Sequence, residues 1–354
     1  MFSKYPEYFL QTKEWADYWQ KANPHRHTFY EFTAEFTPSK KLYCIAYEYP
    51  WQLGAKFWYI PKMPAIQGFS DSEDLKMGLY KLLSQVVAKA KLSQVAFIKC
   101  DFDDNLSSLL NYIDDQSLLK DLSRILQNTG IRKSPKVLQY LSAMVIEPQL
   151  NEHELKTTID NSQLSLEEFF RLSRSFWLTT NENIRRYTKK SLKQGWVVST
   201  EKDQSNFESF WSVYQSTSYR QRFFTHAKSN LEKLLAEKNS RIIVVSDSEG
   251  VPQAVWMGWV SERTLTYLHG GNTPQSFKYY GQYLVHLAAL KIVLQEKLSF
   301  YDLGKYDEGY GYSNFKKGYR GDIRKFAGPI DIVLEPLSYN IISNLLKVKR
   351  LLRP

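Results

Sequence analysis

The strand and helix signals of this chain come in two rounds, and this repetition limits the folds that the chain can adopt. In the first round, three segments between residues 29 and 64 alternate apolar and polar residues, as half-buried strands do. They precede an amphipathic helix at 71–92 and a buried strand at 95–102. A similar order starts again near residue 160, without obvious sequence repetition, and ends in a helix at 278–297 and a strand at 299–304. We therefore expect an α/β (α+β) protein with a duplicated fold.

Local signals place further elements. Asp71 or Ser72 is expected to cap the helix at 71–92. Two capping boxes, Ser165 with Glu168 and Ser205 with Glu208, indicate two more helix starts. We also expect a helix at 115–128 and a strand at 140–148 that closes the first round.

Composition indicates a globular protein from a reducing compartment. Hydrophobic residues make up 43% of the 354 residues and charged residues only 24%, which excludes a disordered chain. The two cysteines, Cys44 and Cys100, lie in apolar strand-like segments and are expected to be buried thiols. The N-terminal sequence lacks the apolar core of a signal peptide, and no segment approaches the ~18 apolar residues of a membrane span. We expect a cytoplasmic protein.

The net charge of +10 favours a polyanionic partner such as nucleic acid, anionic lipid or a phosphorylated substrate, without choosing among them. The six histidines show no metal-binding spacing beyond His25 and His27, so no metal is expected. The sequence has no Walker loop, no GxSxG elbow and no dinucleotide GxGxxG after a strand. Without a nucleophile constellation, direct transfer between two bound substrates is the natural enzymatic option.

The glycine-rich stretch from 300 to 329 is the strongest local candidate for a site. Its glycines allow positive φ and close approach of a ligand, and Phe315 and Lys316 place an aromatic face beside a positive charge. This pair suits a ligand with bases and phosphates, such as an RNA end. The alternative is a glycine-rich hairpin in which Phe315 packs into the core and Lys316 is solvated.

The segment 171–193 is strongly basic, with Glu182 as its one acid. Arg185, Lys189 and Lys193 follow i, i+4, i+8 spacing and share one helical face about 12 Å long. Such a stripe can track phosphates, and it can equally be a solvated helix face. The basic residues of the segment are Arg171, Arg174, Arg185, Arg186, Lys189, Lys190 and Lys193.

Three residues outside these segments are further candidates, each with a structural alternative. Asp101 lies where a buried strand meets a loop, and could instead be a turn or cap residue. Tyr267 precedes a His-Gly-Gly sequence at a strand end, where a core tyrosine is also common. Arg220 could grip a phosphate with two hydrogen bonds or could be exposed after a helix end.

The order of several short motifs along most of the chain resembles the FemABX family of peptidoglycan aminoacyltransferases. No long coiled-coil insertion occurs near residue 230, so the chain is most similar to armless members of the family. The segments that carry the resemblance are Gln11 to Trp15, Tyr59 to Lys62, Phe97 to Asp101, Asn183 to Val197, Gly250 to Pro252, Thr266 to Gly271, Phe300 to Gly304 and Asn314 to Tyr319.

The resemblance implies two tandem GNAT-like domains, each a mixed central sheet flanked by helices. The first domain would cover 1–158 and be completed by the C-terminal segment 330–354, and the second would cover 159–329. The implied reaction moves an amino acid from aminoacyl-tRNA to an amine of a peptidoglycan precursor, either a UDP-MurNAc-peptide or a lipid-linked peptide. No cofactor is implied, because the aminoacyl-tRNA is itself the activated donor, and we expect a monomer.

The resemblance also implies roles for individual residues. Phe315 and Lys316 would lie at the acceptor end of the tRNA, with Lys316 as the charge that stabilises the oxyanion. Asp101, Asp302 and the substrate itself remain alternative proton acceptors. The basic tail from Lys347 to Arg353 could rest on an anionic membrane surface or could simply be solvated. The acceptor-binding residues would be Lys62, Asp101, Arg220 and Tyr267, and the tRNA-binding residues Arg185, Arg186, Lys189, Lys193 and Lys317.

Two alternatives remain at this point. One is an acyl-CoA-dependent N-acyltransferase of the same fold, although 278–283 is a poor match to the pyrophosphate loop that such an enzyme needs. The other is a non-catalytic RNA-binding protein that uses the basic helix and the aromatic loops.

Overall fold

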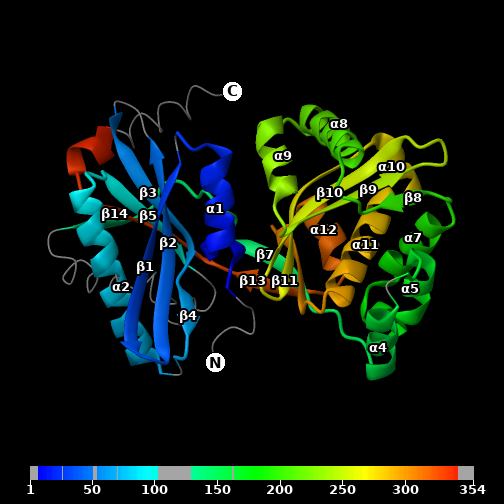
Figure 1. Ribbon diagram of the computed structural model, residues 1–354, viewed down its shortest axis with the longest axis horizontal. Coiled ribbons are helices and arrows are strands. Elements are labelled where there is room, and N and C mark those ends of the chain that lie inside the picture. The colour runs from blue at the N-terminus through cyan, green and yellow to red at the C-terminus, as the bar shows by residue number, and fades with distance from the viewer. Residues whose placement is uncertain are drawn as a thin grey trace. The chain divides into compact units, whose positions relative to one another are not determined.

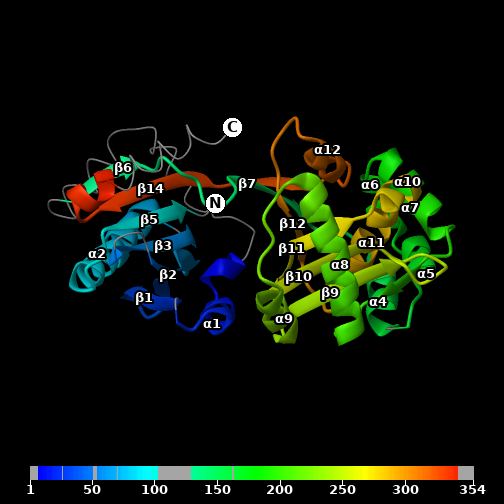
Figure 2. The same cartoon turned by 90° about the horizontal axis from the view of Figure 1, so that it is seen from above.

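A computed structural model shows two compact units (Figures 1 and 2). One consists of Met1–Leu141 with Lys325–Pro354, and the other of Ser142–Arg324. The helix expected at 115–128 and the basic tail from 347 to 353 lie outside the described residues. The structure describes residues 7–25, 27–50, 54–69, 71–102, 129–161 and 163–341.

The first unit is built on a mixed sheet in which β3 and β5 are parallel and the other described pairs are antiparallel. The strand order is β1-β2-β3-β5-β14-β6, with β4 paired to β2. The strands are β1 (Thr28–Thr37), β2 (Lys40–Pro50), β3 (Lys56–Met63), β4 (Ala65–Gln67), β5 (Phe97–Phe102), β6 (Gly130–Lys133) and β14 (Ala327–Val333).

Helices cover both faces of this sheet. On one face, α2 (Ser72–Leu92) packs against the apolar side chains of the strands, Cys44 and Cys100 among them. Asp71 caps α2 as expected, because its carboxylate accepts from the backbone N–H groups of Glu73 and Asp74 at 2.9 and 3.0 Å. The turn η1 (Phe9–Gln11) leads into α1 (Lys13–Ala22), which packs on the other face.

The alternation of side chains along β5 decides where its polar residues point. Ile98 and Cys100 join the core under α2, so Lys99 and Asp101 lie on the opposite face. Lys99 forms a buried ion pair of 2.6 Å with Asp331, its register partner on β14. This pair fastens the returning C-terminal strand to the middle of the first sheet.

The second unit has a mixed sheet in the order β13-β7-β12-β11-β10-β9-β8. Figure 2 shows α8 and α9 on one face of it, with α11 on the other. The core under α11 contains Trp256 and Tyr301, both fully buried.

The strands are β7 (Ser142–Ile146), β8 (Val197–Ser199), β9 (Ser240–Ser246), β10 (Pro252–Ser261), β11 (Thr264–Asn272), β12 (Phe300–Lys305) and β13 (Asp322–Lys325). The helices are α4 (Glu152–Asp160), α5 (Leu166–Leu172), α6 (Arg174–Thr179), α7 (Glu182–Leu192), α8 (Gln204–Gln221), α9 (Lys228–Ala236), α10 (Pro274–Tyr279), α11 (Gly281–Gln295) and α12 (Gly311–Lys317).

The structure confirms the α/β class and the two mixed sheets, but it places one strand differently. The strand expected at 140–148 exists as β7, yet it pairs with β12 through Ile146 and Tyr301 and so belongs to the second sheet. The change of unit therefore falls at Leu141, whereas the expected boundary lay at 158. Likewise β14 begins at Ala327 and belongs to the first sheet, ahead of the expected return at 330. An apolar pattern in the sequence can predict a strand, but it does not indicate which other strands pair with it.

Two expectations about helices were wrong. The helix expected at 278–297 is interrupted at Tyr280, whose φ of 65° ends α10 and starts α11. Asp203 caps α8 in place of the expected Ser205 box, since its carboxylate accepts from the N–H of Asn206 at 2.8 Å. The box of Ser165 and Glu168 is confirmed at the start of α5.

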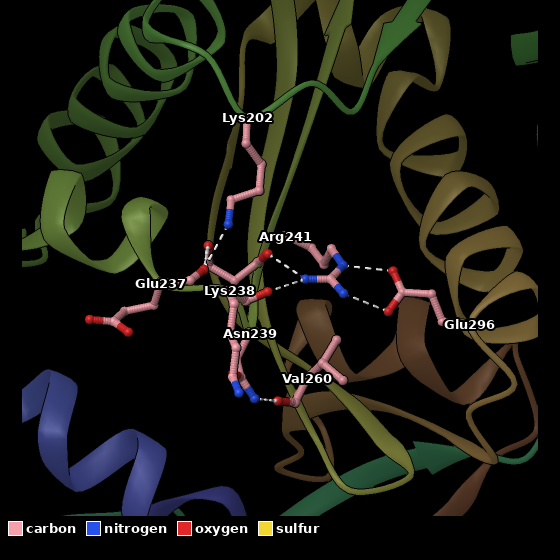
Figure 3. Close-up of polar contacts among 8 residues, drawn as sticks. Lys202, Glu237, Lys238, Asn239, Arg241, Val260 and Glu296 are labelled. Carbon is pink, nitrogen blue, oxygen red and sulfur yellow. Dashed lines mark hydrogen bonds and ion pairs between the residues drawn. The ribbon is translucent and has the colours of Figure 1, made fainter.

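A polar network holds the C-terminal end of α11 against the sheet (Figure 3). The guanidinium of Arg241 on β9 donates to both carboxylate oxygens of Glu296 at 2.6 and 2.7 Å. Next to it, the side chain of Asn239 donates to the carbonyl of Val260 at 2.7 Å. Two parallel hydrogen bonds fix the pair in orientation as well as in distance, so they tie the end of α11 to β9.

Candidate active site

The strands β11 and β12 diverge in the middle of the second sheet. They pair in parallel only from Thr264 to Thr266, opposite Phe300 to Asp302. On its other side, β11 carries one extra residue relative to β10, because Met257 pairs with His269 and Gly258 with Tyr267. The bulge reverses which side chains face each side of the sheet.

As a result, Tyr267 and His269 point to opposite faces. Tyr267 lies toward α11, with its ring centroid 6.0 Å from that of Trp256 and 6.1 Å from that of His286. His269 lies toward α8, with Nδ1 3.4 Å from the hydroxyl of Tyr214. Burial, together with the neighbouring His226, lowers the pKa of His269 to about 3, so the ring is neutral at physiological pH.

The short helix α12 follows β12 and carries Lys316 on its buried side. Lys316 is only 9% exposed, and its ammonium donates to the carbonyl of Lys305 at 2.6 Å. Burial lowers the pKa of Lys316 to about 8, while the carboxylates of Asp302 and Asp307 act in the opposite direction. An ammonium has three N–H donors, and this is the one hydrogen bond that it makes with the described residues.

Phe315, the neighbour of Lys316, is half-buried against α11. Its ring lies 5.1 Å from those of Tyr283 and His286 and 5.5 Å from that of Tyr319. The structure therefore combines the two readings of this stretch: Phe315 packs on the core, but Lys316 is not solvated. The segment is a helix, so the hairpin alternative was wrong.

His286, which was not among the residues expected from the sequence, supports this arrangement. It is buried on α11, and its Nδ1 lies 2.9 Å from the hydroxyl of Tyr301. Burial lowers its pKa to about 3, with the charge of Lys316 as a smaller cause, so its ring is neutral. A single histidine within the apolar run from Tyr283 to Leu290 was the available signal.

In the first unit, Asp101 and Lys62 lie near each other. Asp101 is fully buried, and its Oδ2 accepts a hydrogen bond from the hydroxyl of Tyr59. Its Oδ1 has no hydrogen-bond partner among the described residues. Burial raises the pKa of Asp101, and the positive charge of Lys62 partly offsets this rise. Lys62 donates to the carbonyl of Tyr140 at 2.7 Å.

The remaining candidates lie at the edges of the second unit. Arg220, in the last turn of α8, donates to the carbonyl of Asn272 at the end of β11. Its guanidinium also lies 5.7 Å from the ring centroid of Phe277. The basic side chains of α7 surround a surface depression of about 460 Å³, lined by Glu182, Arg185, Arg186, Lys189, Lys190 and Lys193.

The structure thus brings the candidates together in two groups, Lys62 with Asp101 in the first unit and Phe315 with Lys316 in the second. Within the described residues, no cluster of three or more histidine, cysteine or acidic side chains could hold a metal ion. In that same part of the chain, no helix is both long enough and apolar enough to cross a bilayer.

Comparison with known proteins supports this architecture. Residues 179–317 match the acetyltransferase (GNAT) domain family. The crystal structure of FemX superposes with a TM-score of 0.69 over 95% of both chains, at 15% sequence identity. The chain has a FemX-like tandem GNAT fold. The structure of L-PGS from Bacillus licheniformis follows with a TM-score of 0.50 and 10% identity, covering 97% of this chain and 99% of that one. No curated protein sequence matches the chain.

Proposed function

We propose that the protein is an acyltransferase of the Fem type that moves an amino acid from aminoacyl-tRNA to an amine of a peptidoglycan precursor peptide. The observation that carries the proposal is the buried ammonium of Lys316, held by one backbone carbonyl beside the half-buried ring of Phe315. The FemX-like fold supports it, since both residues fall on the motif that resembles the FemABX family.

The chemistry needs little from the protein beyond positioning and charge. The acceptor nitrogen attacks the carbonyl carbon of the aminoacyl ester, and a tetrahedral oxyanion forms. The bond to the ribose oxygen then breaks, and the acceptor nitrogen loses one proton while the ribose hydroxyl gains one. A fixed positive charge in a partly desolvated site stabilises the oxyanion more than it would in water. Lys316 is the residue to which we assign this role.

Asp101 is the better supported of the two carboxylates that could take the proton. The Oδ1 of Asp302 already accepts from the N–H of Gly304 at 2.7 Å. Asp101 instead has an oxygen without a described partner and a pKa raised by burial. A carboxylate with a raised pKa is a stronger base.

An acyl-CoA donor has less support. The diphosphate of CoA needs open backbone N–H groups at the start of a helix. Here α11 begins at Gly281, where a Cβ atom would lie 2.5 Å from the Trp196 ring. The preceding Tyr280 stacks on Tyr187 at 4.4 Å. Aromatic rings therefore cover this helix start, and these residues do not fit the cofactor.

The acceptor in this proposal is a UDP-MurNAc-peptide or its lipid-linked form. We place the protein in the cytoplasm as a monomer. Contact of the basic tail from Lys347 to Arg353 with the inner membrane face stays a prediction.

The proposal can be tested by replacing Lys316 while following transfer and tRNA binding separately. We expect Lys316→Ala to lower the transfer rate roughly 10²- to 10³-fold, with tRNA binding reduced only a few-fold. Lys317→Ala is the comparison variant for loss of a charge outside the catalytic position, because Lys317 is the exposed neighbour and is expected to act in tRNA binding alone. Its transfer rate at saturating tRNA should stay near that of the unmodified protein. If Lys316→Ala leaves both binding and transfer intact, the site assignment is wrong.

A further inference from the structure

An exposed tyrosine at the start of α12 lies against the buried ammonium of Lys316. Tyr312 and Lys316 are four residues apart in this helix, so their side chains share one face of it. The Nζ of Lys316 lies over the face of the Tyr312 ring, 5.4 Å from the ring centroid, within the range of a cation–π contact. The same Nζ donates to the carbonyl of Lys305 at 2.6 Å. The ammonium is therefore held by a ring face as well as by a carbonyl.

The ring of Tyr312 is itself fixed through its hydroxyl group. This hydroxyl donates to Oδ2 of Asp307 at 2.6 Å, and the same oxygen forms an ion pair of 2.7 Å with Nζ of Lys305. The backbone N–H of Asp307 in turn donates to the hydroxyl of Ser313 at 2.9 Å. These contacts tie the loop after β12 to the start of α12. A rotation that carried the ring away from Lys316 would break its hydrogen bond to Asp307.

Such a contact affects what the charge of Lys316 can do. A lysine ammonium sits on a flexible stem of four carbons, and water solvates it strongly. The ring of Tyr312 limits where Nζ can lie before a substrate binds, and it takes the place of water beside the charge. A charge that is already in place and partly dry stabilises a developing oxyanion more than a mobile, solvated one.

The neighbouring Tyr310 is also exposed but lacks these contacts. Its side chain is 60% exposed, against 41% for Tyr312, and the two ring centroids lie 5.7 Å apart. Among the described residues, the hydroxyl of Tyr310 has no hydrogen-bond partner and its ring has no cation over it. The chain thus offers a matched control on the same loop.

We propose that Tyr312 is a positioning residue, which holds the ammonium of Lys316 in place and shields it from water. The ring provides the shielding, and the hydroxyl fixes the ring through Asp307. The inference rests on the proposed function for the reaction that Lys316 serves. The effect of Tyr312 on Lys316 can be measured without any transfer.

Replacing Tyr312 has two opposite effects on the charge of Lys316. Loss of the ring removes a favourable cation–π contact, but it also lets water reach the ammonium. Burial is the largest cause of the lowered pKa of Lys316, so we expect the gain of water to dominate. The other groups that act on or respond to this charge stay unchanged in the variants, and they are Asp302, Asp307, Lys305 and His286.

The test compares two pairs of variants by two measurements. Tyr312→Leu removes the ring, whereas Tyr312→Phe keeps the ring and loses only the bond to Asp307. Tyr310→Leu and Tyr310→Phe are the matched controls. The titration of Lys316 is followed by NMR of lysines labelled with carbon-13 at Cε, and its signal is identified by its absence in Lys316→Met. Transfer from aminoacyl-tRNA is measured as kcat and KM across about pH 6 to 9.

We expect Tyr312→Leu to move the midpoint of the Lys316 titration from about pH 8 to about pH 9. Its kcat at pH 7 should fall about 10-fold, with the KM for the acceptor within about 2-fold. The loss of transfer at high pH, which reports the deprotonated lysine, should move upward with the titration. Tyr312→Phe should keep most of the activity, with a fall of about 2- to 3-fold. The two Tyr310 variants should change neither quantity.

An unchanged or lowered titration midpoint in Tyr312→Leu would overturn the inference. An equal change in Tyr310→Leu, or an unchanged kcat at pH 7 in Tyr312→Leu, would overturn it as well. If the unmodified protein transfers from no donor, the proposed function fails, but the titration of Lys316 still decides whether Tyr312 positions this residue.

Discussion

Lys316 carries a positive charge at neutral pH, although its burial disfavours the charged form. Its pKa in the folded protein is about 8, against 10.5 for a free lysine side chain. Below pH 8 the ammonium is present in both folded and unfolded protein, and the folded protein bears the full cost of desolvating it. Between pH 8 and 10.5 the folded protein holds fewer protons than the unfolded chain, so this cost disappears as the pH rises.

We therefore expect Lys316→Met to raise the free energy of unfolding at pH 7, by up to about 3 kcal/mol. The difference between the two proteins should shrink as the pH rises from 8 toward 10.5, because the lysine becomes neutral when folded. Urea unfolding of both proteins at several pH values measures this difference directly. A constant difference across this range would mean that Lys316 is not desolvated as described.

The carboxyl of Asp101 gives a second prediction. Asp101→Asn keeps the shape and the hydrogen-bonding partner Tyr59 but cannot take a proton. We expect the rate of transfer at saturating substrates to fall roughly 10²- to 10⁴-fold, with the affinity for the acceptor little changed. Single-turnover transfer and equilibrium binding of the UDP-linked peptide separate the two effects. Near-normal transfer would leave the substrate itself as the proton acceptor.

At this scale the sequence singled out Phe315 and Lys316 as candidates but did not indicate their surroundings. Phe315 and Lys316 stand out by residue type and by the glycines around them. The burial of Lys316 depends on the carbonyl of Lys305 and on the packing of α12 against α11, which no local pattern encodes. His286 was missed because a histidine within an apolar run can equally be a satisfied core histidine.

At the level of secondary-structure elements, the bulge in β11 requires a glycine at position 258 of the paired strand β10. A Cβ atom there would lie 2.1 Å from the Trp256 ring and 2.7 Å from the carbonyl oxygen of Thr266. Because that carbonyl belongs to the paired strand, the backbone itself would have to move. The bulge in turn decides that Tyr267 faces α11.

We expect Gly258→Ala to lower the free energy of unfolding by about 1–3 kcal/mol through overpacking. Gly311→Ala is the matched control, because a Cβ atom at this helical position meets nothing within 4 Å. This change should be neutral or should stabilise by about 0.5 kcal/mol, since alanine reduces the freedom of the unfolded chain. Denaturant unfolding of the two variants checks the contrast, and equal effects would contradict it.

The guanidinium of Arg185 donates to the carbonyls of Trp177 and Thr180 at 3.0 and 2.6 Å, so its support of the end of α6 can be tested separately from RNA binding. Arg185→Ala should destabilise the protein by about 1–3 kcal/mol, because two carbonyls lose a charged donor. The slope of log K against log salt for tRNA binding should change by clearly less than one unit. Thermal unfolding and binding at several salt concentrations measure both quantities. A full unit of slope would place Arg185 among the residues that bind phosphate.

Helix starts were predicted well where a capping residue precedes the apolar pattern, as in α2 and α5. The sheet membership of β7 was not predicted, because an apolar segment does not indicate which strands pair with it. Its placement follows from pairing with a residue far along the chain, Tyr301.

Over the whole molecule, two sheets with separate cores carry two groups of buried ionisable residues. The first unit holds Asp101 near the charge of Lys62, and the second holds Lys316 beside Phe315. The net charge of +10 suits a partner rich in phosphate. The repeated order of strands and helices was enough to predict the duplicated α/β fold, whereas the donor and the acceptor do not follow from the fold.

The most direct test of the account is a transfer assay with competing donors. A pool of radiolabelled aminoacyl-tRNAs and, in parallel, labelled acetyl-CoA are offered with a UDP-MurNAc-peptide and with its lipid-linked form. We predict that label reaches an acceptor from aminoacyl-tRNA alone and that Lys316→Ala abolishes most of it. Label from acetyl-CoA alone, or none from either donor on either acceptor, would contradict the proposed function.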